Sequence, residues 1–187
     1  MGIKKHNAAI KYIGVFLLTA VVLLTNFYAV NAEDTGTVGT SAQAAAVIEQ
    51  NSGRVLYNKN ADQELPMAST TKIMTAAVAL KYGNLSDVIE VSATAAGVEG
   101  SSMYLECGEK ITLENLLYGL MLLSGNDAAV AIAEHIGGGV DGFVELMNKT
   151  ASELGLSHTH FDNPNGLPSD THYTTALELA KITDRKS

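Results

Sequence analysis

Ser69 and Lys72 lie three residues apart, at the start of a segment whose apolar residues recur at helical spacing. Residues at positions i and i+3 share one face of a helix, so the hydroxyl and the amine can meet. A serine hydroxyl is a poor nucleophile unless a base removes its proton. A lysine can be that base only if its amine is neutral, which requires burial or a nearby positive charge. The pair predicts an activated serine, although the same spacing is also typical of a capped helix with a surface lysine.

A second group of polar residues, Ser124-Gly125-Asn126, interrupts an apolar helical stretch. A buried serine and a buried asparagine need hydrogen-bond partners. Ser124 could relay a proton between Lys72 and a leaving amine, and the Asn126 amide could hold a peptide group of a substrate. This is the arrangement of nucleophile, base and orienting group that acyl transfer requires. The alternative is an ordinary turn between helices, with Asn126 capping the second one.

The elements that must position these residues are one hairpin and several helices. Two short apolar runs around a glycine-containing turn predict a β-hairpin over 44–57. We expect a helix over 69–82 that Gly83 ends, a short strand over 87–91, and further helices from Thr112, Asp127, Asp141 and Thr175, the last with a capping box formed with Glu178. The leucine stripe from Leu113 to Leu123 is expected in the core. A hairpin is barely stable alone, so the pattern indicates an α+β domain with further strands beyond the sequence.

The amino-terminal segment and the composition restrict the class of protein. Residues 1–32 combine lysines, a long apolar run and small residues at a cleavage position, which predicts a secretory signal peptide. Residues 33–43 are expected to be a flexible leader and 44–187 the folded domain. The chain of 187 residues has a net charge of −8 and no basic stripe, which excludes a nucleic-acid binder. The single cysteine, Cys107, cannot pair within the chain, and we expect it to be buried.

Four phrases, in this order, resemble the serine D-alanyl-D-alanine carboxypeptidases, which are the low-molecular-mass penicillin-binding proteins of peptidase family S11. The phrases are Pro66 to Lys72, Gly100 to Leu105, Leu123 to Ala129 and Phe161 to Leu167. The resemblance implies a β-lactamase/transpeptidase-like fold, of which this chain would hold the amino-terminal hairpin and the helical subdomain. It also implies a bacterial enzyme of cell-wall biogenesis, either secreted or on the outer face of the cell membrane.

The resemblance further implies a mechanism and roles for four residues. Ser69 would attack the penultimate D-alanine of a peptidoglycan stem peptide, and Lys72 would take its proton. Ser124 would help to return a proton to the departing D-alanine, and Asn126 would bind the acyl-side amide. β-Lactam antibiotics would acylate Ser69 in the same way, and no cofactor or metal is implied.

The sequence departs from the family pattern in one respect. The family has a third box, Lys-Thr-Gly or His-Thr-Gly, and no such triplet occurs in the chain. We therefore expect an N-terminal fragment without the later sheet strands and the C-terminal membrane anchor. On its own, this fragment should fold poorly and have little activity. Membrane contact would come only from an uncleaved amino-terminal segment or from the missing anchor.

Two other functions stay open at this point. One is a serine β-lactamase-type hydrolase, which needs a glutamate-directed water for fast deacylation. No glutamate occurs in the segment Asn163 to Leu167, where it would lie. The other is a catalytically inactive, secreted wall-binding module. His158 and His160 do not indicate a metal site, because no third ligand is evident.

Overall fold

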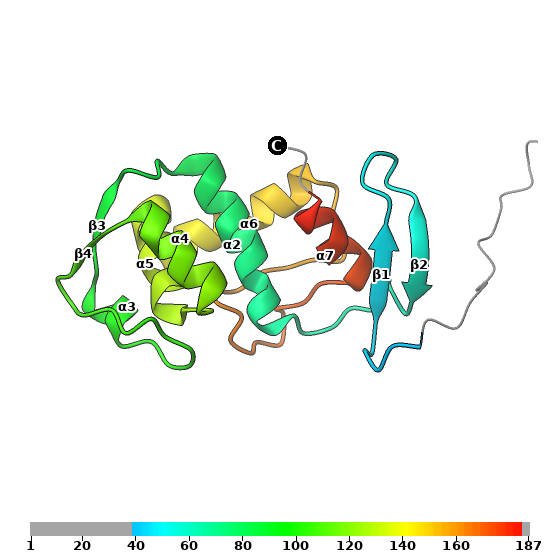
Figure 1. Cartoon of the computed structure of the whole chain (residues 1–187), viewed down its shortest axis with the longest axis horizontal. Helices are drawn as coiled ribbons and strands as arrows, with labels where there is room; N and C mark the ends of the chain where they lie inside the picture. Colours follow the sequence, from blue (N-terminus) through cyan, green and yellow to red (C-terminus); the bar gives the residue numbers. More distant parts are fainter. Residues whose placement is uncertain (1–38, 185–187) are drawn as a thin grey trace, which may run out of the picture. The chain divides into compact units, whose positions relative to one another are not determined.

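The computed structural model describes residues 39–184, whose helices and strands belong to the unit that begins at Thr40. In chain order the elements are β1 (Ala45–Ile48), β2 (Val55–Lys59), η1 (Ala68–Thr70), α2 (Thr71–Tyr82), β3 (Val88–Glu90), α3 (Ala93–Ala96), β4 (Lys110–Thr112), α4 (Leu113–Leu122), α5 (Asn126–Gly137), α6 (Val140–Glu153) and α7 (Ala176–Thr183) (Figure 1). The predicted hairpin, the strand at 87–91 and the five longer helices are confirmed. The predicted signal peptide, residues 1–32, and most of the leader lie outside the described residues. No helix among residues 39–184 is long and apolar enough to cross a membrane.

Strands β1 and β2 form the predicted antiparallel hairpin, with Val47 opposite Tyr57. The turn between them is held by Glu49, whose carboxylate accepts hydrogen bonds from the backbone of Asn51 and of Ser52. It also accepts one from the Ser52 hydroxyl, and that bond is the main reason that the pKa of Glu49 is lowered to about 2. Local side-chain bonds thus explain why the chain reverses at this point.

A second two-stranded sheet, β3 with β4, was only half predicted. Val88 to Glu90 pairs antiparallel with Lys110 to Thr112, and Ile89 lies opposite Ile111. Strand β4 has only three residues, and its pattern is too short to be seen in sequence. The side chain of Thr112, at the end of β4, accepts a hydrogen bond from the backbone of Asn115 and so caps α4 as predicted.

The core is built mainly by helices packed around α5, whose residues from Asn126 to Ala133 are all buried. Its alanines allow close contact with the neighbouring helices α3, α4 and α6. The largest fully buried side chains of this core include Phe143, Phe161, Met74, Leu113, Leu116, Leu120 and Ile132. Burial of each such side chain stabilises the fold by about 1.5 to 3 kcal/mol. Gly137 ends α5 where a Cβ atom would lie 2.3 Å from the backbone nitrogen of Phe143, so a larger residue would separate α5 from α6.

Two burial predictions were wrong. Leu123, the last residue of the leucine stripe, is 58% exposed, because α4 ends at Leu122 and Leu123 lies in the turn that follows. Cys107 is exposed as well. It lies in the connection between α3 and β4, outside any helix or strand. Helical periodicity and residue type predict burial only inside an element that continues.

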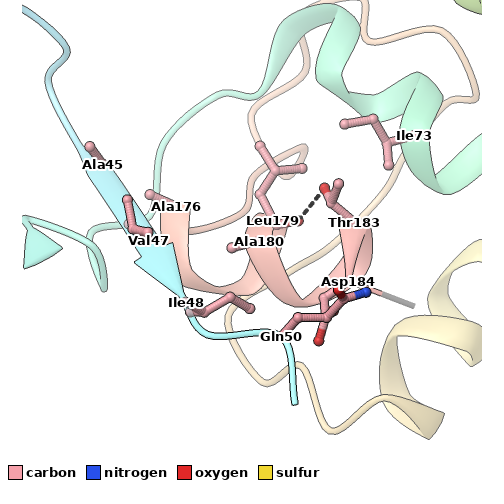
Figure 2. Close-up of a pocket in the computed structure, with 11 residues that line it drawn as sticks. Ala45, Val47, Ile48, Gln50, Ile73, Ala176, Leu179, Ala180, Thr183 and Asp184 are labelled. Carbon is pink, nitrogen blue, oxygen red and sulfur yellow. Dashed lines mark hydrogen bonds between the residues drawn. The ribbon is translucent and has the colours of Figure 1, made fainter. Parts of the chain in front are cut away.

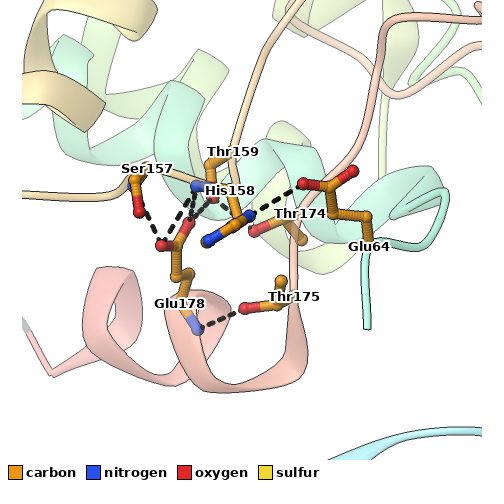
Figure 3. A network of polar contacts seen from close by, with 7 residues as sticks. All are labelled: Glu64, Ser157, His158, Thr159, Thr174, Thr175 and Glu178. Atoms are coloured by element: carbon orange, nitrogen blue, oxygen red, sulfur yellow. Dashed lines mark hydrogen bonds and ion pairs between the residues drawn. The ribbon is translucent and has the colours of Figure 1, made fainter. Parts of the chain in front are cut away.

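Helix α7 is held by the buried carboxylate of Glu178 (Figure 3). Glu178 accepts hydrogen bonds from the backbone of Ser157 and His158 and from the Thr159 hydroxyl. Thr175 caps the helix through the backbone of Glu178, as predicted. The reciprocal half of the predicted capping box was wrong, because the Glu178 side chain turns away to bind the 157–159 segment.

The same helix forms one wall of an apolar groove of about 630 Å³ between β1 and α7 (Figure 2). Ile48, Ile73 and Leu179 are among its lining residues. Neither Ser69, Lys72 nor Asn126 lines it, so this groove is separate from the residues that the sequence singled out.

Candidate active site

Ser69 lies in η1, the short turn that leads directly into α2, and its side chain is exposed. The residue before it, Ala68, has a φ of 46°, which is a strained conformation for an alanine. The backbone of Gly166, from a distant loop, packs against this turn. A Cβ atom at Gly166 would lie 2.0 Å from the Ala68 carbonyl oxygen, so the loop backbone presses directly against the serine turn. With its own φ of +90°, Gly166 is also in a conformation that favours glycine.

Lys72 is buried in the first turn of α2, with 2% of its surface exposed. Its Nζ lies 3.2 Å from Ser69 Oγ, 2.8 Å from Asn126 Oδ1 and 2.7 Å from the Asn165 carbonyl oxygen. None of these partners carries a charge, and burial lowers the pKa of Lys72 to about 8. In the neutral form two hydrogens can stay on Asn126 and Asn165, which leaves the lone pair of the nitrogen facing Ser69. The predicted contact between serine and lysine is therefore present, and the surface-lysine alternative is wrong.

Asn126 is the first residue of α5, and its side chain does not cap that helix. Gly125 occupies the cap position, which overturns the alternative of an ordinary interhelical turn capped by Asn126. The Asn126 amide instead spans the site: Oδ1 accepts from Lys72, and Nδ2 donates to the Glu99 carbonyl at 2.6 Å. At Gly100 a Cβ atom would lie 2.5 Å from this Nδ2, so the 99–101 segment closes tightly over the amide.

Ser124 lies between α4 and α5, two residues before Asn126, with a φ of 58°. Among residues 39–184, no hydrogen bond joins its hydroxyl to Ser69 or Lys72. The structure thus places Ser69, Lys72 and Asn126 in one hydrogen-bonded group, and it tethers Ser124 to that group through the backbone.

Two contributions to the site were not predicted from the sequence, although both lie in phrases that carry the family resemblance. The first is Asp127, a fully buried carboxylate next to Asn126. It accepts hydrogen bonds from the Ser102 hydroxyl and from the backbone of Met103, Leu105 and Ala128. Burial by itself raises the pKa of Asp127, but these hydrogen bonds outweigh it and leave that pKa below the ordinary value. Asp127 therefore holds residues 102–105, which directly follow the 99–101 segment that covers Asn126.

The second is the Asn163–Leu167 turn, which supplies the Asn165 carbonyl to Lys72. Asn163 Oδ1 accepts from the backbone of Asn165, Gly166 and Leu167, and the Thr75 hydroxyl of α2 donates to the Pro164 carbonyl at 2.6 Å. The Asn-Pro-Asn-Gly composition signals a turn. It cannot signal which distant side chain the turn will meet.

A model of the D-alanyl-D-alanine carboxypeptidase family, peptidase S11, matches residues 29–186. The chain belongs to this family. Its sequence is 43% identical over 173 residues to the D-alanyl-D-alanine carboxypeptidase DacF of Bacillus subtilis, covering 88% of this chain and 44% of that protein. It is 36% identical over 194 residues to the D-alanyl-D-alanine carboxypeptidase of Streptomyces sp. K15, covering 97% of this chain and 65% of that one.

Solved structures of this family share the fold. The crystal structure of the D-alanyl-D-alanine carboxypeptidase DacD of Francisella tularensis matches with a TM-score of 0.75 at 40% identity, over 80% of this chain and 37% of that chain. The S216A mutant of the Streptomyces K15 DD-transpeptidase matches with a TM-score of 0.75 at 37% identity, over 78% of this chain and 61% of that chain. The predicted DD-peptidase fold class is confirmed. The chain spans about half the length of the curated relatives that it matches.

Proposed function

We propose that the protein removes the terminal D-alanine from peptidoglycan stem peptides through an acyl-enzyme on Ser69. The observation that carries this proposal is the hydrogen bond between Ser69 and a buried Lys72 that has no carboxylate partner among residues 39–184. A lysine whose pKa is lowered by burial is neutral often enough at neutral pH to act as a base. The family membership supports the choice of a D-alanyl-D-alanine terminus as the substrate.

The side chains of the site account for each bond and each proton transfer of the proposed reaction. Ser69 Oγ forms a bond to the carbonyl carbon of the penultimate D-alanine, and its proton passes to Lys72. The carbon–nitrogen bond to the terminal D-alanine then breaks, and the leaving amine takes the proton from Lys72 through Ser124. The Ser124 hydroxyl is not hydrogen-bonded to Lys72 in this structure, so this step requires it to come within reach of Lys72 Nζ when the substrate binds. Water hydrolyses the ester and frees Ser69. Asn126 Nδ2 carries a second hydrogen besides the one donated to Glu99, and we assign it to the carbonyl of the acyl-side amide.

β-Lactams are the second ligand class of this proposal, because they would acylate the same hydroxyl. The peptidoglycan substrate of this proposal lies outside the cytoplasm, so we propose an extracytoplasmic location for the protein. The chain contains no Lys-Thr-Gly or His-Thr-Gly triplet to bind a substrate carboxylate and to support the oxyanion. Loss of one oxyanion donor slows such reactions about 10²–10³-fold, so we expect slow acylation by this chain alone.

Intact-mass spectrometry of the purified chain with a fluorescent penicillin tests the proposal. We expect a slowly accumulating adduct, located on Ser69 by peptide mapping, and no adduct in Ser69→Ala. Ser152→Ala is the matched control, because Ser152 is an exposed serine on α6 outside the site. Absence of any Ser69 adduct after prolonged incubation would favour the inactive wall-binding module. Rapid, stoichiometric labelling together with a cooperative melt would contradict the expected low activity, and fast turnover of nitrocefin would favour a β-lactamase.

A further inference from the structure

His172 is a buried imidazole that contacts the start of α2 from a segment 101 positions along the chain. Only 3% of its surface is exposed. Its Nε2 lies 2.7 Å from the Thr71 hydroxyl oxygen, and its Nδ1 lies 3.0 Å from the backbone nitrogen of Asp162. The Phe161 ring packs edge-on against it, with the ring centroids 5.8 Å apart.

These contacts determine the protonation state of the ring. A backbone N–H can only donate, so Nδ1 of His172 must accept from Asp162 and carries no hydrogen. In the neutral ring the hydrogen is then on Nε2, which donates to Thr71. A protonated ring has hydrogens on both nitrogens, and the one on Nδ1 would point at the Asp162 N–H. Only the neutral imidazole fits between the two partners.

The two partners of His172 belong to the two sides of the site. Thr71, which lies between Ser69 and Lys72 in the sequence, is fully buried in the first turn of α2. Asp162 begins the loop that carries the Asn165 carbonyl to Lys72 and packs Gly166 against Ala68. The imidazole therefore links the loop that hydrogen-bonds to Lys72 with helix α2, which carries Lys72.

We propose that neutral His172 is a positioning residue that holds the 161–172 loop on the Ser69–Lys72 turn, and that its protonation releases the loop and stops acylation in acid. The acylation step rests on the function proposed above, whereas the positioning contact does not. The titratable groups that bear on the ring are Asp162, which raises the pKa of His172, and His160, which lowers it. Burial is the largest influence and leaves the pKa of His172 below its ordinary value, so the ring is neutral at pH 7.

A first experiment tests the positioning contact without any substrate. Nitrogen-15 NMR of the full chain should show His172 as the Nε2–H tautomer, titrating below pH 6.5. Carbon-13 NMR should show the Lys72 ε-carbon titrating near pH 8 in the wild type and at a higher pH, toward the ordinary lysine value of 10.5, in His172→Phe, because the released loop lets water reach the amine. An Nδ1–H tautomer, or an unchanged Lys72 titration in a folded His172→Phe variant, would overturn the proposal.

A second experiment measures the rate of Ser69 labelling by penicillin between pH 5 and pH 8. Two groups must be neutral in the wild type, so the rate should rise with a slope of two decades per pH unit below the pKa of His172 and one above it. His172→Gln keeps a donor for Thr71 but cannot gain a proton, and its slope should be one throughout. The control His135→Gln, at an exposed histidine paired with Asp87, should keep the wild-type profile.

The two hypotheses fail in different ways. A slope of two that persists in His172→Gln, or a wild-type rate profile with no change of slope at the pH where NMR shows His172 titrating, would refute the positioning role while labelling of Ser69 continues. If Ser69 is not labelled in any variant, the proposed function fails, and the NMR titrations still decide whether His172 positions the loop.

Discussion

The pKa of Lys72 makes the sharpest prediction for the proposed reaction. With a pKa of about 8, roughly 9% of the lysine is neutral at pH 7. A lysine with the ordinary pKa would be neutral about 300 times less often. Since only the neutral amine can take the proton of Ser69, the burial of Lys72 is expected to supply most of its competence as a base.

The perturbations are pH and the substitution Lys72→Arg. The neutral fraction grows about 25-fold from pH 6.5 to pH 8.5 when the pKa is about 8, so the labelling rate should grow by that factor and level off near pH 9. Arginine keeps the positive charge but does not deprotonate in proteins, and Lys72→Arg should slow labelling by about 10³-fold or more. The control Lys149→Arg, at an exposed lysine of α6, should change nothing.

The assay is the rate of penicillin adduct formation on Ser69, followed by mass spectrometry at fixed ionic strength. A labelling rate that is flat between pH 6.5 and pH 8.5 would refute the role of Lys72 as the base. So would a Lys72→Arg variant that labels at the wild-type rate. A circular-dichroism melt of each variant shows whether it is folded, and so distinguishes slow labelling caused by the missing base from slow labelling caused by unfolding.

Three further substitutions test the supports of the site, each read by a urea titration. Gly166→Ala should unfold at lower urea and slow the labelling of Ser69 at least tenfold, because its Cβ would clash with the Ala68 carbonyl of the serine turn. The control Gly155→Ala has open space around its Cβ, and its free energy of unfolding should fall by only about 1–2 kcal/mol because of its left-handed backbone. Asp127→Asn should lose about 1–3 kcal/mol above pH 5, and wild-type stability should fall in acid as this carboxylate protonates, because its pKa is lowered in the folded state. Leu120→Ala should lose about 2–5 kcal/mol, and an unchanged midpoint would show that α4 is not packed as described. Leu122→Ala on the same helix is 77% exposed in the parent chain and should stay within about 0.5 kcal/mol.

Local patterns in the sequence were sufficient to predict most helices and the spacing of the site. The Ser69–Lys72 separation, the cap at Thr112 and the turn before Gly53 all act over about four residues, which is the range of helix periodicity and of side-chain-to-backbone bonds. For this reason the hairpin was predicted to within two residues at each end, whereas the predicted start of the helix at Ser69 was two residues early, because Ser69 lies in the 3-10 turn η1 and α2 begins at Thr71.

The three-residue strand β4 and the exposure of Leu123 and Cys107 depended on contacts that no local pattern contains. The chemistry depended on such contacts even more. Lys72 obtains its neutral partners from Asn126 and Asn165, which are 54 and 93 positions away. The three-residue spacing alone was enough to predict that Ser69 and Lys72 would lie one turn apart and in contact. The lowered pKa of Lys72 could not be predicted in this way, because its burial comes from segments that folding brings together from across the chain.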